Sequence, residues 1–151
     1  MKKGMTWVLG LAIAGILAGA AFAQFAKTED AIKYRQSVMS LIGTHFSRMG
    51  AVVKGEAPYN KEAFEKNALL VDSLYRLGLD AFMAPGSDKG SGMKADALAQ
   101  KDKFTQMHNA TETELAKLVA VAKGGDLNAI KPQFGAAGAS CKACHDAYRN
   151  K

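Results

Sequence analysis

The sequence predicts an all-α protein that folds as an antiparallel four-helix bundle. Four segments carry apolar residues at the helical spacing of three and four, and strand-like alternation is absent from the sequence. One long, turn-rich connection and two short ones join the segments, so each helix should run antiparallel to the one before it. The 151 residues are a one-domain length, and no composition shift divides residues 24–151.

The first predicted helix begins near Thr28, a favoured N-cap residue, and ends at Lys54-Gly55, where glycine suits a C-cap. Glu29 and Asp30 lie in its first turn, where the helix dipole favours negative charge. The apolar stripe that should face the core consists of Ile32, Met39, Ile42, Phe46, Met49 and Val53.

The second predicted helix starts near Asn60, and the third runs from about Ala95 to Lys123. A glycine-rich loop, residues 83–92, separates them, and Gly124-Gly125 ends the third. The inward residues expected in the second helix are Phe64, Val71, Leu74, Leu77 and Ala81. Those expected in the third are Phe104, Met107, Thr111, Leu115, Leu118 and Ala122.

The fourth predicted helix follows Asp126 or Asn128. Pro132 would obstruct a helix interior, so the regular helix should start late enough to place this residue in its first turn. Its apolar stripe comprises Leu127, Ile130, Phe134, Ala137, Cys141, Cys144 and Tyr148. Both cysteines are therefore expected to face the core.

Residues 1–23 read as a secretory signal peptide. Lys2 and Lys3 precede an apolar run over residues 7–17, and Ala21-Phe22-Ala23 offers a cleavage site just before Gln24. The alternative is an uncleaved membrane anchor, but the apolar run is short for a span of about 20 residues. The mature protein, residues 24–151, is therefore expected in the periplasm.

The net charge gives little support for a nucleic-acid partner. Lys2 and Lys3 would leave with the signal peptide, so the mature chain carries +4 rather than +6. The remaining Lys and Arg residues are interleaved with acidic ones and form no basic block that would follow a phosphate backbone. A mild positive charge could still attract an acidic redox partner.

The segment Cys141-Lys142-Ala143-Cys144-His145 carries the most specific chemistry in the chain. A C-x-x-C-H pattern is the sequence signature of covalent c-type haem attachment. Cysteines three apart on a helix point the same way, so both thiols can reach the two vinyl groups on one edge of a porphyrin. His145, four residues after Cys141, can then bring an imidazole nitrogen to the iron.

Three other readings of this cysteine pair compete with haem. A disulfide across so short a loop would remove little entropy from the unfolded chain. A thioredoxin-like pair usually sits at a helix N-terminus, whereas this one lies near a helix end in an all-α chain. Zinc would need further ligands, and His45 and His108 are the other histidines.

The residues around this motif resemble a known family. The C-terminal stretch from Gly138 to Arg149, which reads GASCKACHDAYR, is similar to the C-terminus of the cytochrome c′ family. The first helix resembles it too, with Tyr34-Arg35-Gln36-Ser37 and later Lys54-Gly55-Glu56-Ala57-Pro58-Tyr59. The resemblance covers residues 24–151 and implies a four-helix bundle with one haem c.

The resemblance also implies roles for individual residues. Cys141 and Cys144 match the thioether cysteines, and His145 matches the proximal iron ligand. Arg35 and Gln36 match residues near the haem propionates; read alone, they would be solvated surface positions. Arg149 matches a basic residue beside the proximal face, and Met39 matches the position over the distal face. The chain departs from the family at Leu77-Gly78-Leu79, where many members carry Leu-Pro-Trp.

Met39 decides between two functions that the resemblance implies. If Met39 only packs over the iron, the five-coordinate haem admits small gases such as NO and CO, which is the outcome we expect. If the thioether binds the iron, the protein is a low-spin His/Met electron carrier of the cytochrome c-556 type. The distal lining expected from the resemblance is Met39, Ile42 and Phe82.

An apolar lining of this kind argues against an enzyme, because a peroxidase needs a polar acid–base group beside the iron. We therefore expect an electron carrier and gas binder with redox partner proteins. His45 and His108 are expected at the surface or its boundary rather than as iron ligands. Family members often pair through their first two helices, which implies a possible homodimer.

Overall fold

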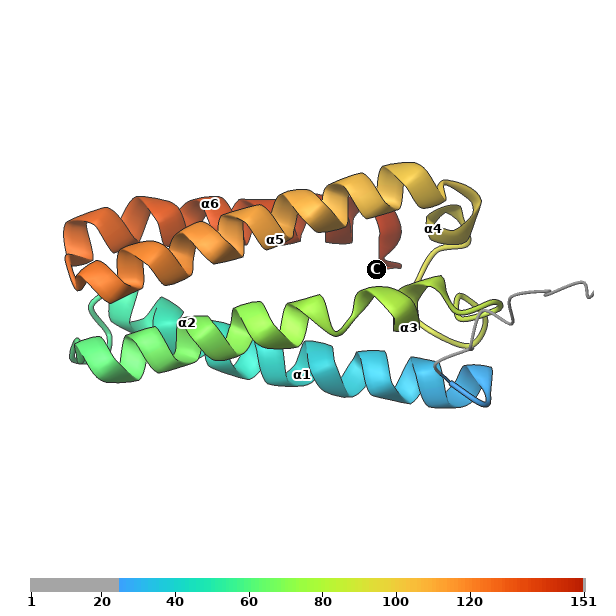
Figure 1. Cartoon of the computed structure of the whole chain (residues 1–151), viewed down its shortest axis with the longest axis horizontal. Helices are drawn as coiled ribbons and strands as arrows, with labels where there is room; N and C mark the ends of the chain where they lie inside the picture. The colour runs from blue at the N-terminus through green and yellow to red at the C-terminus, as the bar shows by residue number, and fades with distance from the viewer. Residues whose placement is uncertain (1–24, 151) are drawn as a thin grey trace, which may run out of the picture.

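The computed structural model describes residues 25–150, and six helical segments lie in that range (Figure 1). The predicted signal peptide and its cleavage before Gln24 fall outside the described residues. Four helices are long and two are single turns in the connection between the second and third long helices. Their bounds are α1 Thr28–Val53, α2 Lys61–Arg76, α3 Leu79–Met83, α4 Asp96–Ala99, α5 Lys101–Gly124 and α6 Leu127–Tyr148.

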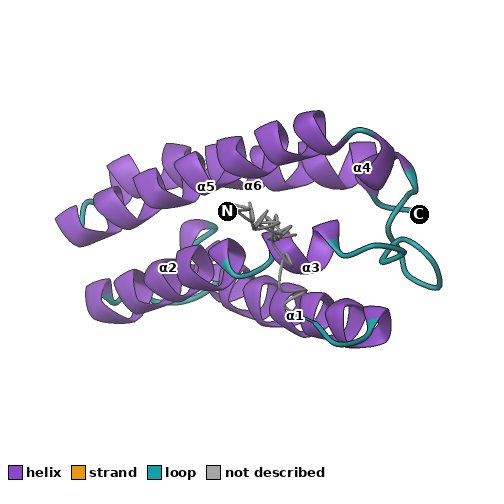
Figure 2. Ribbon diagram, turned by 45° about the vertical axis from the view of Figure 1, so that its right-hand side comes forward, coloured by secondary structure: helices purple, strands orange, loops and turns teal. Residues whose placement is uncertain are grey.

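The predicted antiparallel four-helix bundle is confirmed. Helices α1 and α2 form one pair, α5 and α6 form the other, and α2 packs on α5 to join them (Figures 1 and 2). No strand occurs within residues 25–150; an isolated antiparallel bridge joins Met93 to Arg149. None of the described helices has the length and apolarity needed to cross a membrane.

The helix ends follow the expected chemistry at two places and depart from it at one. The Asn60 side chain caps α2 by accepting a hydrogen bond from the Ala63 N–H at 2.8 Å. Asp126 caps α6 in the same way through the Asn128 N–H at 2.9 Å. Thr28 was expected to cap α1, but its hydroxyl instead donates to the Pro85 carbonyl at 3.0 Å, while Lys27 is the N-cap residue.

The second predicted helix is broken in the structure. It ends at Arg76. Hydrogen bonds to the carbonyl three residues back, from Leu77 N to Leu74 O and from Gly78 N to Tyr75 O, then tighten the last turn before α3 begins. This change of direction leaves Leu77 51 % exposed, so the expectation that it points inward is wrong. The third predicted helix is also divided, because Gln100 adopts a non-helical conformation between α4 and α5.

Pro132 was expected in the first turn of the last helix and instead lies in the second turn of α6. Its ring nitrogen cannot bond the Asn128 carbonyl, which loses its intrahelical donor. Both residues are exposed, so water can take the place of that hydrogen bond. The helix therefore tolerates the proline without a break.

The main core fills the bundle between the four long helices. Its buried residues come from every long helix and are mostly aliphatic: Val38, Ile42, Met49, Phe64, Ala68, Val71, Tyr75, Leu115, Leu118, Val119, Ala122, Ile130 and Ala137. A second, smaller cluster of Met93, Ala97, Phe104 and Tyr148 lies where α6 ends. The space between these two clusters is where the candidate site lies.

Leu118 offers a test of the core. It is 1 % exposed, so Leu118→Ala should lower the free energy of unfolding of the haem-loaded protein by about 2–5 kcal/mol, because the cavity left behind collapses only partly. Lys103→Ala is the control at an exposed side chain of the same helix, and it should cost less than about 0.5 kcal/mol. Equal losses for the two variants in denaturant titrations would contradict this core assignment.

Candidate functional site

A cavity of about 560 Å³ opens at the end of the bundle where α6 ends. Its volume lies in the range of small-molecule and cofactor sites, about 300–1,000 Å³. It brings together every site residue expected from the sequence: Arg35, Gln36, Met39, Cys141, Cys144, His145 and Arg149. The other lining residues are Ser40, Ile42, Gly43, Phe46, Tyr75, Phe82, Gly92, Met93, Phe104, His108 and Tyr148.

The last turns of α6 supply the two thiols and an imidazole. Cys141 and Cys144 are free, partly buried and one helical turn apart, and burial raises the pKa of both thiols. His145 follows in the last turn, and burial together with the nearby positive charge of Arg149 lowers its pKa. A histidine kept neutral in this way retains a free nitrogen lone pair, which is what a metal ligand requires.

Arg35 is a buried cation on the wall of the cavity. Its side chain is 4 % exposed, and it donates to the Ser87 carbonyl at 3.1 Å and contacts the Met93 sulfur at 3.5 Å. The guanidinium also lies 5.1 Å from the centre of the Phe82 ring. Burial lowers its pKa, and no carboxylate within residues 25–150 forms an ion pair with it. A buried charge of this kind calls for an anionic partner.

The segment 84–95 fastens Arg35 to the end of α6. Lys94 N donates to the Tyr148 carbonyl and Asn150 N donates to the Gly92 carbonyl, both at 2.8 Å. The Lys94 ammonium adds bonds of 3.1 Å to the carbonyls of Asp146 and Ala147. These contacts place segment 84–95 as a wall of the cavity next to the C-x-x-C-H turn.

The three residues expected to line the distal side lie around one cavity. Met39, Ile42 and Phe82 all border the cavity, with Ile42 buried and the other two partly buried. Gln36 also borders it but is exposed, so it lies at the mouth rather than in the interior. The apolar surface of these residues suits a flat hydrophobic occupant.

His108 corrects one sequence expectation. It was expected at the surface or its boundary, yet it is 1 % exposed and borders the cavity. Its ring stacks on Tyr75 with centres 4.4 Å apart, and burial lowers its pKa. His45 matches its expected boundary position, where it is partly buried and bonds the Asn67 side-chain oxygen at 2.7 Å.

The sequence contained a signal for the burial of both His108 and Tyr75. Phe104, His108, Thr111 and Leu115 are spaced by four, three and four, so His108 belongs to the inward stripe of α5. Tyr75 follows Val71 by four in the same way on α2. Histidine is often found at or near surfaces, and the expectation for His108 followed this tendency rather than the spacing.

The cavity residues fit a covalently held haem. The C-x-x-C-H turn supplies two thiols and an imidazole on one edge, and Arg35 offers a buried positive charge for a carboxylate. Three buried polar atoms also have no hydrogen-bond partner in the described structure: both ring nitrogens of His108 and the Tyr148 hydroxyl. Both residues border the cavity, so a flat, mostly apolar occupant with polar groups at its edge would offer them partners.

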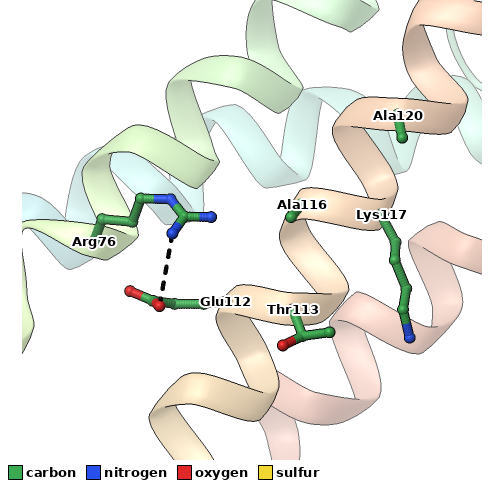
Figure 3. A pocket seen from close by; sticks show the side chains of 6 residues that line it. All are labelled: Arg76, Glu112, Thr113, Ala116, Lys117 and Ala120. Carbon is green, nitrogen blue, oxygen red and sulfur yellow. Dashed lines mark ion pairs between the residues drawn. The ribbon is translucent and has the colours of Figure 1, made fainter.

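A second hollow lies on the outside of the bundle between α2 and α5 (Figure 3). Arg76 and Glu112 face each other there with a nitrogen–oxygen distance of 3.7 Å. The remaining lining residues are Thr113, Ala116, Lys117 and Ala120. These small or exposed side chains provide no thiol or imidazole, so this hollow does not suit a haem.

The bundle and its cavity define a class of protein: an all-α c-type haem protein with the attachment motif on its last helix. The family model of cytochrome c′ matches residues 30–149 of this chain. The cytochrome c′ of Alcaligenes xylosoxydans is 44 % identical over 128 residues, which cover 85 % of this chain and 99 % of that protein. The cytochrome c′ of Rubrivivax gelatinosus is 40 % identical over 130 residues, covering 85 % and 100 %. The chain belongs to the cytochrome c′ family, and its cofactor is haem c.

Solved structures agree with this assignment. The structure of cytochrome c′ from Alcaligenes xylosoxidans matches with a TM-score of 0.80 at 44 % identity, covering 85 % of this chain and 100 % of that one. A variant of that protein has been solved with carbon monoxide bound, with the same TM-score of 0.80. Another variant has been solved as a nitric oxide complex, again with a TM-score of 0.80.

Arg35→Leu tests the link between α1 and segment 84–95. The variant removes the donor to the Ser87 carbonyl, so it should lower the free energy of unfolding by about 1–3 kcal/mol. Amide hydrogen exchange within residues 85–93 should become faster than in the parent protein. Arg48→Leu is the control at an exposed arginine of the same helix and should leave that exchange unchanged. Unchanged exchange in Arg35→Leu would show that this bond does not hold the segment.

Proposed function

We propose that the protein is a periplasmic electron carrier that also binds NO or CO at a five-coordinate, histidine-ligated haem iron. The single observation that carries this proposal is the meeting of the C-x-x-C-H turn with the apolar side chains of Met39, Ile42 and Phe82 in one cavity. Haem c, when bound there, supplies a one-electron iron couple and an open coordination position for a small uncharged gas.

Each lining residue has a separate proposed role. Cys141 and Cys144 would hold the haem through thioether bonds, and His145 would supply an imidazole ligand to its iron. Arg35, with Gln36 at the mouth, receives the propionates; the lack of a carboxylate partner for Arg35 among residues 25–150 supports this role. Arg149 acts beside the proximal face, where its charge already lowers the pKa of His145.

Met39 is proposed as a packing residue over the distal face rather than as a ligand. The carbon monoxide and nitric oxide complexes are of two variants of one relative, the Alcaligenes xylosoxidans cytochrome c′, which is 44 % identical to this chain, and they favour an accessible sixth position here. The alternative is ligation by the Met39 sulfur, which would give a low-spin carrier of the cytochrome c-556 type.

No catalytic role is proposed. The family consists of haem proteins named as cytochromes, and Met39, Ile42 and Phe82 offer no acid or base beside the distal position. His108 adds one polar group to a lining that the sequence predicted to be apolar.

The setting of the protein is also part of the proposal. Residues 1–23 have the pattern of a secretory signal cleaved before Gln24, so the mature domain of residues 24–151 would act in the periplasm with redox partner proteins. A homodimer through α1 and α2 is supported by four exposed leucines on or just after these helices: Leu41, Leu69, Leu70 and Leu77.

Covalent attachment is tested with the cysteines. Protein exported from a host that matures c-type cytochromes should have the mass of residues 24–151 plus one haem, and acid–acetone should not extract the pigment. Replacing Cys141 and Cys144 by Ser should give little stable haem-loaded protein, because no bond then holds the cofactor in the core. Ser140→Ala, next to the motif, is the control and should retain the haem. Extraction of the pigment from the parent would contradict thioether attachment.

Met39→Leu separates the two ligation states. If Met39 only packs, the substitution conserves volume and should cost less than about 1.5 kcal/mol of unfolding free energy. The visible spectrum should stay high-spin, and NO or CO binding should change in rate alone. A low-spin parent that becomes high-spin in Met39→Leu, with a lower reduction potential, would establish the Met39 sulfur as a ligand instead.

A further inference from the structure

His108 lies between the haem cavity and the outer hollow. It borders the cavity with 1 % of its surface exposed, while its Nδ1 lies 3.8 Å from a carboxylate oxygen of Glu112. Glu112 in turn lines the hollow between α2 and α5 and is 25 % exposed, paired with Arg76 (Figure 3). Two side chains therefore span the distance from the haem cavity to solvent.

Within residues 25–150 neither ring nitrogen of His108 makes a hydrogen bond of ordinary geometry, although the Tyr75 backbone and the Asn109 side chain, like Glu112, lie close enough to favour its charged form. Such a group is costly to bury unless it is used for binding or chemistry. Its position is fixed, because the imidazole stacks on Tyr75 with ring centres 4.4 Å apart and an interplanar angle of 20°. The ring is thus held with Nδ1 toward Glu112, and Nε2 is the nitrogen farther from the α5 backbone.

We propose that electron uptake by the haem is coupled to proton uptake at His108, with Glu112 as the group that exchanges this proton with solvent. This inference rests on the proposed haem function of the cavity. In the step, a reduced one-electron donor gives one electron to the ferric cofactor, and one proton from water passes by way of Glu112 to the neutral imidazole. The electron and the proton arrive together, so the net charge of the cavity does not change.

The physical reason is electrostatic. An extra electron in a buried, low-dielectric cavity is stabilised by a positive charge nearby, and a neutral histidine that can become an imidazolium supplies one. Burial lowers the pKa of His108, which keeps the ring neutral before reduction, while Glu112 favours its charged form. By thermodynamic linkage, reduction then strengthens proton binding and protonation raises the reduction potential.

The charged and titratable groups around His108 come from each packed element. Glu112 lies on its own helix, Tyr75 and Arg76 come from α2, and Arg35 comes from the α1 side of the cavity. From α6 the cavity wall receives Cys141, Cys144, His145, Tyr148 and Arg149. In the haem-loaded protein the two cysteines would be neutral thioethers. Glu112 is therefore the carboxylate in contact with the ring among the described residues.

The test is the reduction potential of the haem-loaded protein between about pH 4 and pH 8, the range around an ordinary histidine pKa. The parent potential should be highest at low pH and fall as His108 loses its proton. In His108→Gln this fall should disappear, since glutamine does not titrate. In Glu112→Gln it should move to lower pH, because the charge that favours the imidazolium is gone.

Glu114→Gln provides the matched control, a carboxylate lost from the same helix but bonded to Lys117 and Gln133 rather than near His108. Its profile should equal that of the parent. If His108→Gln does not load haem, Glu112→Gln decides the matter, since Glu112 lies outside the cavity. A flat parent profile, or a fall that Glu112→Gln leaves at the same pH, would overturn the proposal. The visible spectrum separates this outcome from a failure of haem binding.

Discussion

The site depends on the hydrogen bonds by which segment 84–95 connects α1 to the end of α6. On one side this segment receives the Arg35 guanidinium through the Ser87 carbonyl and the Met93 sulfur. On the other side Lys94 N donates to the Tyr148 carbonyl at the end of α6, and Asn150 N, two residues beyond α6, donates to the Gly92 carbonyl of the segment. The wall of the cavity and the turn that carries Cys141, Cys144 and His145 are therefore held relative to α1 by hydrogen bonds, although segment 84–95 itself contains no helix. Because α1 and α6 have few direct contacts, this connection adds to the link between them.

Several polar groups of the cavity are buried without a partner in the described part of the chain when the cavity has no occupant. Arg35 is buried without a carboxylate among residues 25–150, and His108 and the Tyr148 hydroxyl lack hydrogen-bond partners there. Leaving such groups unpaired costs free energy that the apolar core must offset. A cofactor that brings carboxylates and a large flat apolar surface removes this cost, so its binding and the folding of this end of the bundle are linked. Covalent attachment keeps the cofactor in place through any local opening.

The cavity also combines two environments that serve different purposes. Met39, Ile42 and Phe82 make an apolar lining that suits a small uncharged gas, whereas His108 and Glu112 lead from the α5 side toward water. The chain places these features on different helices, α1 and α3 for the first and α5 for the second. A change of protonation at His108 can thus act on the iron through the electric field without altering the side chains that border a bound gas.

The sequence by itself determined the helical class, the attachment motif and most of the core. These follow from local rules: apolar spacing specifies which face of a helix is buried, Asn60 caps the backbone that follows it, and a C-x-x-C-H turn places its thiols and imidazole on one face of the same helix. The resemblance to a known family then indicated that Arg35, Met39 and Arg149 would meet this turn, and all three border the same cavity.

Only the tertiary structure decided the details that depend on the packing of distant segments. Tyr75 continues the buried stripe of α2, whereas the tightened end of that helix before α3 left Leu77 exposed. The spacing of His108 is that of a core residue, whereas histidine as a residue type is often found near the surface. In the structure His108 is buried and stacks on Tyr75 from another helix. The burial of Arg35 likewise required a carbonyl 52 residues away in the chain. The burial of these side chains depends on contacts with segments far away in the chain. A local sequence pattern contains no information about which distant residue will be in contact.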